Sequence, residues 1–157
     1  GHVHLKVADL KRSLRFYCDV LGFKITQRCG ADAAFISSGV YHHHIGLNTW
    51  QSSEGLPPGP NTTGLYHFAI LYPTRREFAE AFNRISMANV LIDGASDHGV
   101  SEAIYLRDPD NNGIELYWDR PVEQWPKDEN GELAMTTKSL NRNSLLEEIN
   151  LKCTCTW

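Results

Sequence analysis

The chain has 157 residues, which is long enough to bury a core of its own and predicts one domain. Its formal charge is −4 and no run of Lys or Arg exceeds a pair, so we expect no nucleic-acid partner. No apolar run approaches the roughly 20 residues of a membrane span, and no signal-peptide pattern is present, so we expect no membrane partner. The four cysteines do not form a disulfide framework, which predicts a reducing, cytoplasmic location.

The first residues change from strand to helical periodicity. Alternation over residues 3–7 places His2 and His4 on the polar face of a predicted strand. Asp9 is a typical helix cap and Gly22 a typical helix stop. The apolar residues between them recur at helical spacing: Leu10, Leu14, Tyr17 and Leu21. Short strands are then expected at about 23–29, 33–38 and 42–50.

The same order of elements returns from residue 66 onward. His67 lies on the polar face of a predicted strand, in the place that His2 occupies 65 residues earlier. Thr74 and Glu77 form a capping box, and a helical apolar pattern follows. We interpret Arg75 in its first turn as solvated. Further strands are expected at about 90–93, 102–107 and 113–118.

The repeat predicts an α+β fold built from paired βαβββ modules. The two halves are 1–50 and 65–118, joined by a Pro/Gly/Ser-rich linker at 51–64, and together they form a predicted domain 1–120. The remaining segment, 121–157, is polar and turn-rich, and we expect an irregular tail with a short helix at about 144–150. Cys153 and Cys155 form a Cys-x-Cys pair in this tail. No second Cys or His pair lies nearby, so we expect no metal site there.

Glu115 raises a question because it interrupts an apolar strand. Ile114, Leu116 and Trp118 share one face of that strand, and Glu115 shares the other with Tyr117. Desolvating a carboxylate costs several kcal/mol unless it is paired or bound to a cation. Taken singly, Glu115 facing solvent and two satisfied histidines would explain the pattern. Taken together, His2, His67 and Glu115 form the two-imidazole, one-carboxylate set that suits Fe(II), with Mn(II) as the near relative.

Four stretches carry a resemblance to a known family. HLKVADLKRSLRFYCDVLGF resembles the opening signature of the vicinal oxygen chelate superfamily, which contains glyoxalases, bleomycin-resistance proteins and extradiol dioxygenases. TGLYHFAIL, ASDHGVSEAIYLRDPDNNGIELYWDRP and YHHHIGLN together are most similar to bacterial catechol-2,3-dioxygenases. The resemblance covers roughly residues 1–120 and implies one curved mixed sheet around a metal site, with helices outside.

The resemblance also implies which residues form the site. The metal ligands of the family fall on His2, His67 and Glu115. An acid–base histidine of extradiol enzymes falls on His43, where it requires hydrogen-bond reach to the substrate rather than to the metal. A tyrosine ten residues before the glutamate matches Tyr105, and a histidine in the preceding loop matches His98.

The activity implied is extradiol cleavage of a catecholic substrate with Fe(II) and O2, giving a muconic semialdehyde. Two alternatives remain open. A glyoxalase-type lyase or isomerase with Zn(II) or Ni(II) usually adds a glutamate from the closing strand of the first half, and HHHIGLNTW has no carboxylate. A non-catalytic module for small-molecule binding or for dimerisation is the other alternative. The expected partners are a small aromatic substrate and O2.

The organisation departs from the family in one respect. Catechol-2,3-dioxygenases of this kind usually carry two modules, so we expect either a homo-oligomer or a missing second module. The first residue is Gly1 and a strand is predicted at once, from which we expect a trimmed or partial chain.

The histidine run leaves a conflict. Strict strand alternation places His42 and His44 on the polar face, whereas the family match selects His43. A β-bulge beside the run would reconcile the two.

Overall fold

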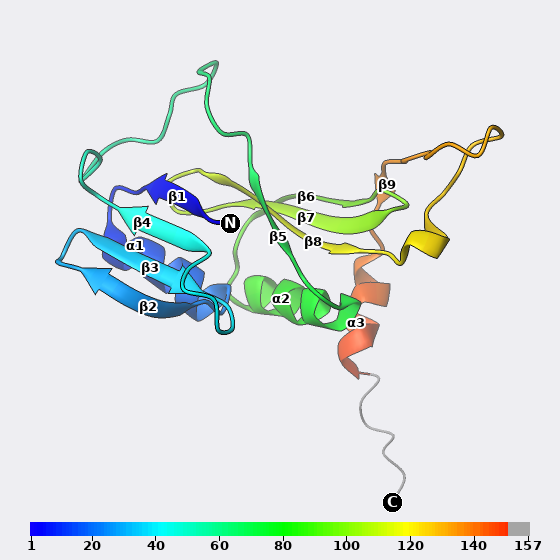
Figure 1. Ribbon diagram of the computed structural model, residues 1–157, viewed down its shortest axis with the longest axis horizontal. Helices are drawn as coiled ribbons and strands as arrows, with labels where there is room; N and C mark the ends of the chain where they lie inside the picture. Colours follow the sequence, from blue (N-terminus) through cyan, green and yellow to red (C-terminus); the bar gives the residue numbers. More distant parts are fainter. Residues whose placement is uncertain (151–157) are drawn as a thin grey trace, which may run out of the picture. The chain divides into compact units, whose positions relative to one another are not determined.

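The computed structural model describes residues 1–150 (Figure 1), so Cys153 and Cys155 lie outside the described residues. The contacts divide the chain into two compact units. One consists of Gly1–Phe68 with Arg107–Gly113, and the other of Ala69–Leu106 with the chain from Ile114 onward. No helix within residues 1–150 has the length and apolarity needed to span a membrane.

The first unit contains a four-stranded mixed sheet in the order β1-β4-β3-β2. Its strands are β1 (Val3–Lys6), β2 (Lys24–Cys29), β3 (Ala33–Ser37) and β4 (Ile45–Asn48). β1 pairs with β4 in parallel, and the other pairs are antiparallel. The predicted aliphatic face of β1 is buried at Leu5 and Val7, while His2 and His4 are exposed, as the alternation predicts.

The helix after β1 begins at its predicted cap. The Asp9 side chain accepts a hydrogen bond from the Arg12 amide, and α1 (Leu10–Leu14) continues into a π-helical segment, η1 (Arg15–Val20). Gly22 has a φ of 89°, the left-handed conformation that ends a helix and that glycine adopts without strain.

The second unit contains a five-stranded sheet in the order β5-β8-β7-β6-β9. Its strands are β5 (Phe68–Leu71), β6 (Ile92–Asp97), β7 (Ser101–Arg107), β8 (Gly113–Asp119) and β9 (Lys138–Ser139). Without β9, this order repeats that of the first sheet strand for strand, which confirms the internal βαβββ repeat and the α+β class. We expected one curved sheet, but the hydrogen bonds form two, one for each half.

Two helices accompany the second sheet. Thr74 caps α2 (Arg75–Met87) by accepting from the Glu77 amide, and Phe78, Phe82 and Ile85 are buried at the predicted spacing. Figure 1 shows α3 (Arg142–Asn150) beside α2.

Arg75 is not the solvated residue that we expected. Its guanidinium lies 2.8 Å from a carboxylate oxygen of the buried Glu102 and 2.8 Å from one of Glu148. Helical periodicity places Arg75 at a helix start but carries no information on a partner 27 or 73 residues away.

The segment after β8 returns to its own sheet. Figure 1 shows residues 120–137 as a long loop, interrupted by the short 3-10 helix η2 (Val122–Gln124). β9 then pairs antiparallel with β6, and the Thr136 amide donates to the His98 carbonyl at 3.0 Å.

Tyr17 should make the free energy of unfolding decrease at alkaline pH. It is fully buried, and its hydroxyl donates to Asp108 at 2.8 Å. Burial first, and then the negative charge of Asp108, raise the pKa of Tyr17 well above its ordinary value. The folded state therefore favours the neutral phenol. Its contribution to stability is complete below the unfolded-state pKa of about 10 and is lost as the pH rises beyond it.

Chemical denaturation at several pH values tests this dependence. The free energy of unfolding of the wild type should fall between about pH 9 and pH 11 more steeply than that of Tyr17→Phe, which has no buried phenol to ionise. Tyr66→Phe, at a residue that is 83% exposed, should keep the wild-type slope. Parallel slopes in wild type and Tyr17→Phe would contradict the assignment.

Candidate active site

The polar face of the first sheet carries a group of aromatic rings. The His2 ring lies 4.4 Å, centroid to centroid, from that of His43, and the His43 ring lies 4.8 Å from that of Phe35. His43 therefore shares the face of the predicted ligand His2, although it comes from the segment before β4.

Gly46 forms the middle of this face. It pairs with His4 on one side and Phe35 on the other. A Cβ atom at Gly46 would lie 2.9 Å from Cδ2 of His4, so the imidazole occupies the space that a side chain would need. The His4 Nε2 accepts from the Asn48 side-chain amide at 3.0 Å, so this ring nitrogen already has a partner within the sheet.

The three adjacent histidines have three different environments. Residues 41–44 are irregular, and β4 begins only at Ile45, so strand alternation does not apply to His42, His43 and His44. The His44 Nδ1 accepts from the Ser37 hydroxyl at 2.8 Å and from the Ser38 amide at 3.3 Å, which gives His44 a structural role in this turn. Beside the run, the structure thus has an irregular segment where a bulge would have reconciled alternation with the family match.

His43 is half-buried, and its Nδ1 lies 2.6 Å from that of the exposed His42, so one nitrogen donates and the other accepts. Partial burial first, then the neighbouring His2 and His42 imidazoles, lower the pKa of His43 below its ordinary value. A neutral imidazole at neutral pH has the proton-accepting nitrogen that a general base requires.

His67 lies directly before β5 and is half-buried. The Tyr66 carbonyl and the Cβ of His67 lie close to Gly113, at the start of β8. A Cβ atom at Gly113 would overlap the Tyr66 carbonyl oxygen and would lie 3.0 Å from Cβ of His67. Only glycine at residue 113 allows this approach, so the backbone that carries His67 lies directly against the start of β8.

Glu115 belongs to a chain of polar contacts in the second unit. The Tyr105 hydroxyl donates to the Glu115 Oε1 at 3.0 Å, and the His98 Nε2 lies 2.9 Å from the same hydroxyl. The His98 Nδ1 lies 3.1 Å from the Thr136 carbonyl. Three of the predicted site residues therefore form one chain of polar contacts, in the order Glu115, Tyr105 and His98.

The protons in this chain are coupled. The Tyr105 hydroxyl has one hydrogen, so while it donates to Glu115 the His98 Nε2 must donate to it. The His98 Nδ1 has two neighbours, the Thr136 carbonyl at 3.1 Å and the Thr137 hydroxyl at 3.4 Å, and it donates to the first or accepts from the second. One phenolic hydrogen thus links Glu115 to His98.

The contact with Thr136 is the part of this chain that the sequence did not predict. We expected an irregular tail after residue 120, but residues 136–139 return to the edge of β6. The β-branched pair Thr136–Thr137 before Lys138 is the one signal in favour of a strand, and it is too short to be decisive.

The predicted donor set fits a divalent iron ion by its chemistry. His2 and His67 offer imidazole nitrogens and Glu115 a carboxylate that is hydrogen-bonded by Tyr105, as metal-binding carboxylates commonly are. The predicted ligands are divided between the units, with Glu115 in the second. Within residues 1–150, no group of three His, Cys, Asp or Glu side chains is arranged to hold a metal ion.

The sequence matches the Glyoxalase/Bleomycin resistance protein/Dioxygenase superfamily over residues 1–116. The chain belongs to this superfamily. Among solved structures, a glyoxalase/dioxygenase from Nostoc punctiforme aligns with a TM-score of 0.62 at 23% identity, covering 76% of this chain and 90% of that one. This likeness confirms the glyoxalase-type fold.

Two relatives in the superfamily carry dioxygenase names. The catechol-2,3-dioxygenase of Bacillus subtilis (strain 168) is 41% identical over 148 residues, which are 94% of this chain and 51% of that protein. The biphenyl-2,3-diol 1,2-dioxygenase 3 of Rhodococcus globerulus is 30% identical over 120 residues, 76% of this chain and 62% of that protein. The chain thus spans between half and two thirds of the length of these relatives. By its name, the superfamily holds glyoxalases and bleomycin-resistance proteins as well as dioxygenases.

Proposed function

We propose that the chain carries the catalytic site of an extradiol dioxygenase, which cleaves a catecholic ring with Fe(II) and O2. His2, His67 and Glu115 would hold the iron. His43, Tyr105 and His98 would handle protons at the substrate. The two dioxygenase relatives support the reaction type, and their names support a substrate with adjacent ring hydroxyls.

One observation carries the proposal. In each half, a proposed acid–base residue contacts a proposed ligand. The ring centroids of His43 and His2 are 4.4 Å apart, and the Tyr105 hydroxyl oxygen lies 3.0 Å from the Glu115 Oε1. Four residues selected from separate parts of the sequence meet in two pairs. A structural role for all four would not require either pairing.

The iron, when bound, would supply the centre at which the catechol and O2 are brought together. The chain's own residues would move the protons. His43 would take a hydroxyl proton from the catechol at an imidazole nitrogen and later return it. Tyr105 would hold its hydroxyl hydrogen between Glu115 and His98, so that a change of charge near Glu115 is answered by the orientation of one O–H bond.

The first sheet supports this reaction over a glyoxalase-type one. β4 reads Ile-Gly-Leu-Asn and contains no carboxylate, and the His4 ring fills the space above Gly46. A fourth ligand from this strand, of the kind that glyoxalase-type enzymes use, is therefore missing. The Phe35 and Trp50 rings, near His4 at 5.9 Å and 5.7 Å, give the same face an aromatic surface suited to a flat ring.

The test is anaerobic loading of the chain with Fe(II), followed by exposure to air with a panel of catechols. The proposal predicts one iron per chain and a yellow ring-cleavage product from at least one catechol. Iron that does not remain bound to the wild type would overturn the proposal. Bound Zn(II) or Ni(II) with isomerase activity and no O2 uptake would favour the glyoxalase-type alternative.

His43→Ala should retain the iron and lose turnover by roughly 100-fold or more, the usual contribution of a positioned acid or base. Val40→Ala, at a fully exposed residue of the same segment, is the control and should turn over at close to the wild-type rate. Steady-state kinetics and iron analysis of both variants measure the difference. Loss of iron in His43→Ala would instead make His43 a ligand.

A further inference from the structure

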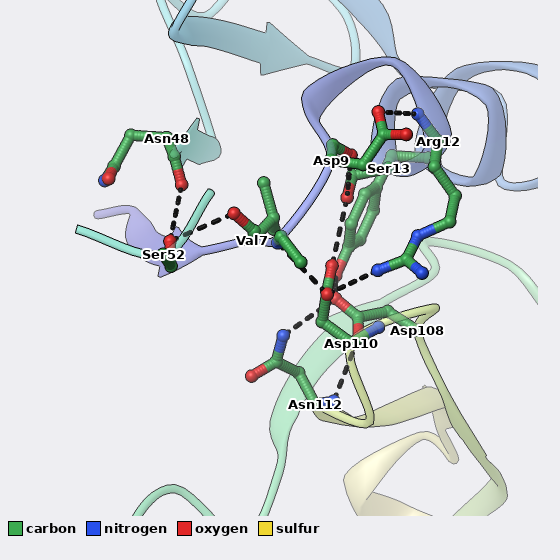
Figure 2. Close-up of polar contacts among 11 residues, drawn as sticks. Val7, Asp9, Arg12, Ser13, Asn48, Ser52, Asp108, Asp110 and Asn112 are labelled. Atoms are coloured by element: carbon green, nitrogen blue, oxygen red, sulfur yellow. Dashed lines mark hydrogen bonds and ion pairs between the residues drawn. The ribbon is translucent and has the colours of Figure 1, made fainter. Parts of the chain in front are cut away.

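The loop between β7 and β8 is fastened to the first helix by a buried aspartate. Figure 2 shows Asp110 beneath Arg12 and Ser13. One carboxylate oxygen accepts from the Ala8 amide at 3.1 Å and from the Arg12 guanidinium. The other lies 3.3 Å from the Ser13 hydroxyl, whose single hydrogen is shared with the Asp9 carbonyl at 3.0 Å. Asp110 is only 6% exposed, so these contacts are what compensates the loss of water around its charge.

The contacts of Asp110 are additional to those that shape the turn. Asp108 closes the loop, because its Oδ1 accepts from the amides of Asp110 and Asn112 at 2.9 and 2.8 Å. Asp128 closes an exposed loop in the same way, accepting from the amides of Asn130 and Glu132. That loop has no counterpart of Asp110 among its hydrogen bonds. Turn chemistry therefore explains Asp108 and leaves Asp110 unexplained.

The loop that Asp110 fastens touches the backbone of two predicted ligand segments. Its far end is Gly113, whose backbone lies against Tyr66 and His67. Two residues further along β8 is Glu115. Its near contact is Ala8, at the end of the segment that begins with His2 and β1. A displacement of residues 107–113 would therefore move the start of β8 and release the backbone of His67.

We propose that Asp110 is a positioning residue for the metal site. It acts through the loop, by fixing Gly113 against His67 and by setting where β8 begins, and it touches neither metal nor substrate. This inference rests on the proposed function for its consequence in metal binding. Its structural part, the coupling of Asp110 to the backbone of residues 66–67 and 113–115, does not.

The experiment compares wild type, Asp110→Asn and Asp128→Asn. Asp110→Asn keeps the volume of the side chain but removes the negative charge that Arg12 and Ser13 contact. Titration with Mn(II), followed by electron paramagnetic resonance, should show binding weakened by roughly 10- to 100-fold, the usual effect of a change in the groups that orient ligands. Hydrogen exchange should be faster at residues 66–68 and 113–115. Asp128→Asn should change neither quantity.

Arg12→Gln provides a variant that folds even where Asp110→Asn does not. Arg12 is half-exposed, and its buried Nε has no hydrogen-bond partner among the described residues, so removing the guanidinium disturbs little else. It should weaken Mn(II) binding in the same direction by a smaller factor. Unchanged Mn(II) binding and unchanged exchange at residues 66–68 and 113–115 in both variants would overturn the inference.

The two proposals fail in different ways. If wild type binds no Mn(II), the metal site is wrong, and hydrogen exchange alone then decides the role of Asp110. Wild type and Asp110→Asn could instead bind Mn(II) equally well, with the variant unfolding at a different denaturant concentration from wild type. Asp110 would then contribute to stability alone, and the positioning role would be wrong.

Discussion

His67→Ala should abolish metal retention and ring cleavage together. An imidazole ligand supplies a coordinate bond that the methyl group of alanine does not replace, so we expect metal affinity to fall by at least the roughly 100-fold that loss of an outer-shell partner can cause. The fold should persist, because His67 is half-buried and precedes β5 rather than lying in the core. Iron analysis after anaerobic loading and desalting measures the effect.

His4→Ala is the matched control for this variant. His4 is exposed on the same kind of strand face, but its Nε2 accepts from Asn48 and its ring covers Gly46. It should keep one iron per chain. Stoichiometric iron in His67→Ala, or loss of iron in both variants, would contradict the assignment of His67 as a ligand.

Gly113→Ala should be strongly destabilising. A Cβ atom there would overlap the Tyr66 carbonyl oxygen, and backbone cannot rotate away as a side chain can. Overpacking of this kind typically costs about 1–3 kcal/mol and occasionally more, and we expect the upper end of that range. If the strain is relieved by movement of residues 66–67, metal binding should weaken as well.

Gly59→Ala is the control, because a Cβ atom at Gly59 would meet nothing within 4 Å. Denaturant titration should give it a free energy of unfolding within about 0.5 kcal/mol of wild type, as for other surface substitutions. A Gly113→Ala chain as stable as Gly59→Ala would show that the close approach to Tyr66 does not exist in solution.

Local periodicity predicted most of the fold. The caps at Asp9 and Thr74 and the glycine stop at Gly22 lie where the sequence places them, because a cap is a contact over three or four residues. The strand order is the same in both halves because the same succession of strand and helix patterns recurs in the sequence of both. Separation into two sheets was not predictable, since it depends on which backbone groups pair across the chain.

The contacts of the candidate site residues could not be predicted from the sequence. His43 faces His2 because the His44 amide pairs with the Ile36 carbonyl and β4 starts only at Ile45. This pairing joins two separate segments of the chain, so the alternation of residues within one segment does not predict it. The roles of Thr136 and Asp110 rest likewise on partners 38 and 97 to 102 residues away.

The most direct test of the proposed reaction follows the oxygen atoms. The Fe(II)-loaded chain is given a catechol that it consumes in an atmosphere of ¹⁸O₂, and the product is analysed by mass spectrometry. Extradiol cleavage predicts a ring-opened product that contains both atoms of one O2 molecule, formed by wild type and absent with His67→Ala. A product without ¹⁸O, or equal amounts of labelled product from both proteins, would contradict the proposed site.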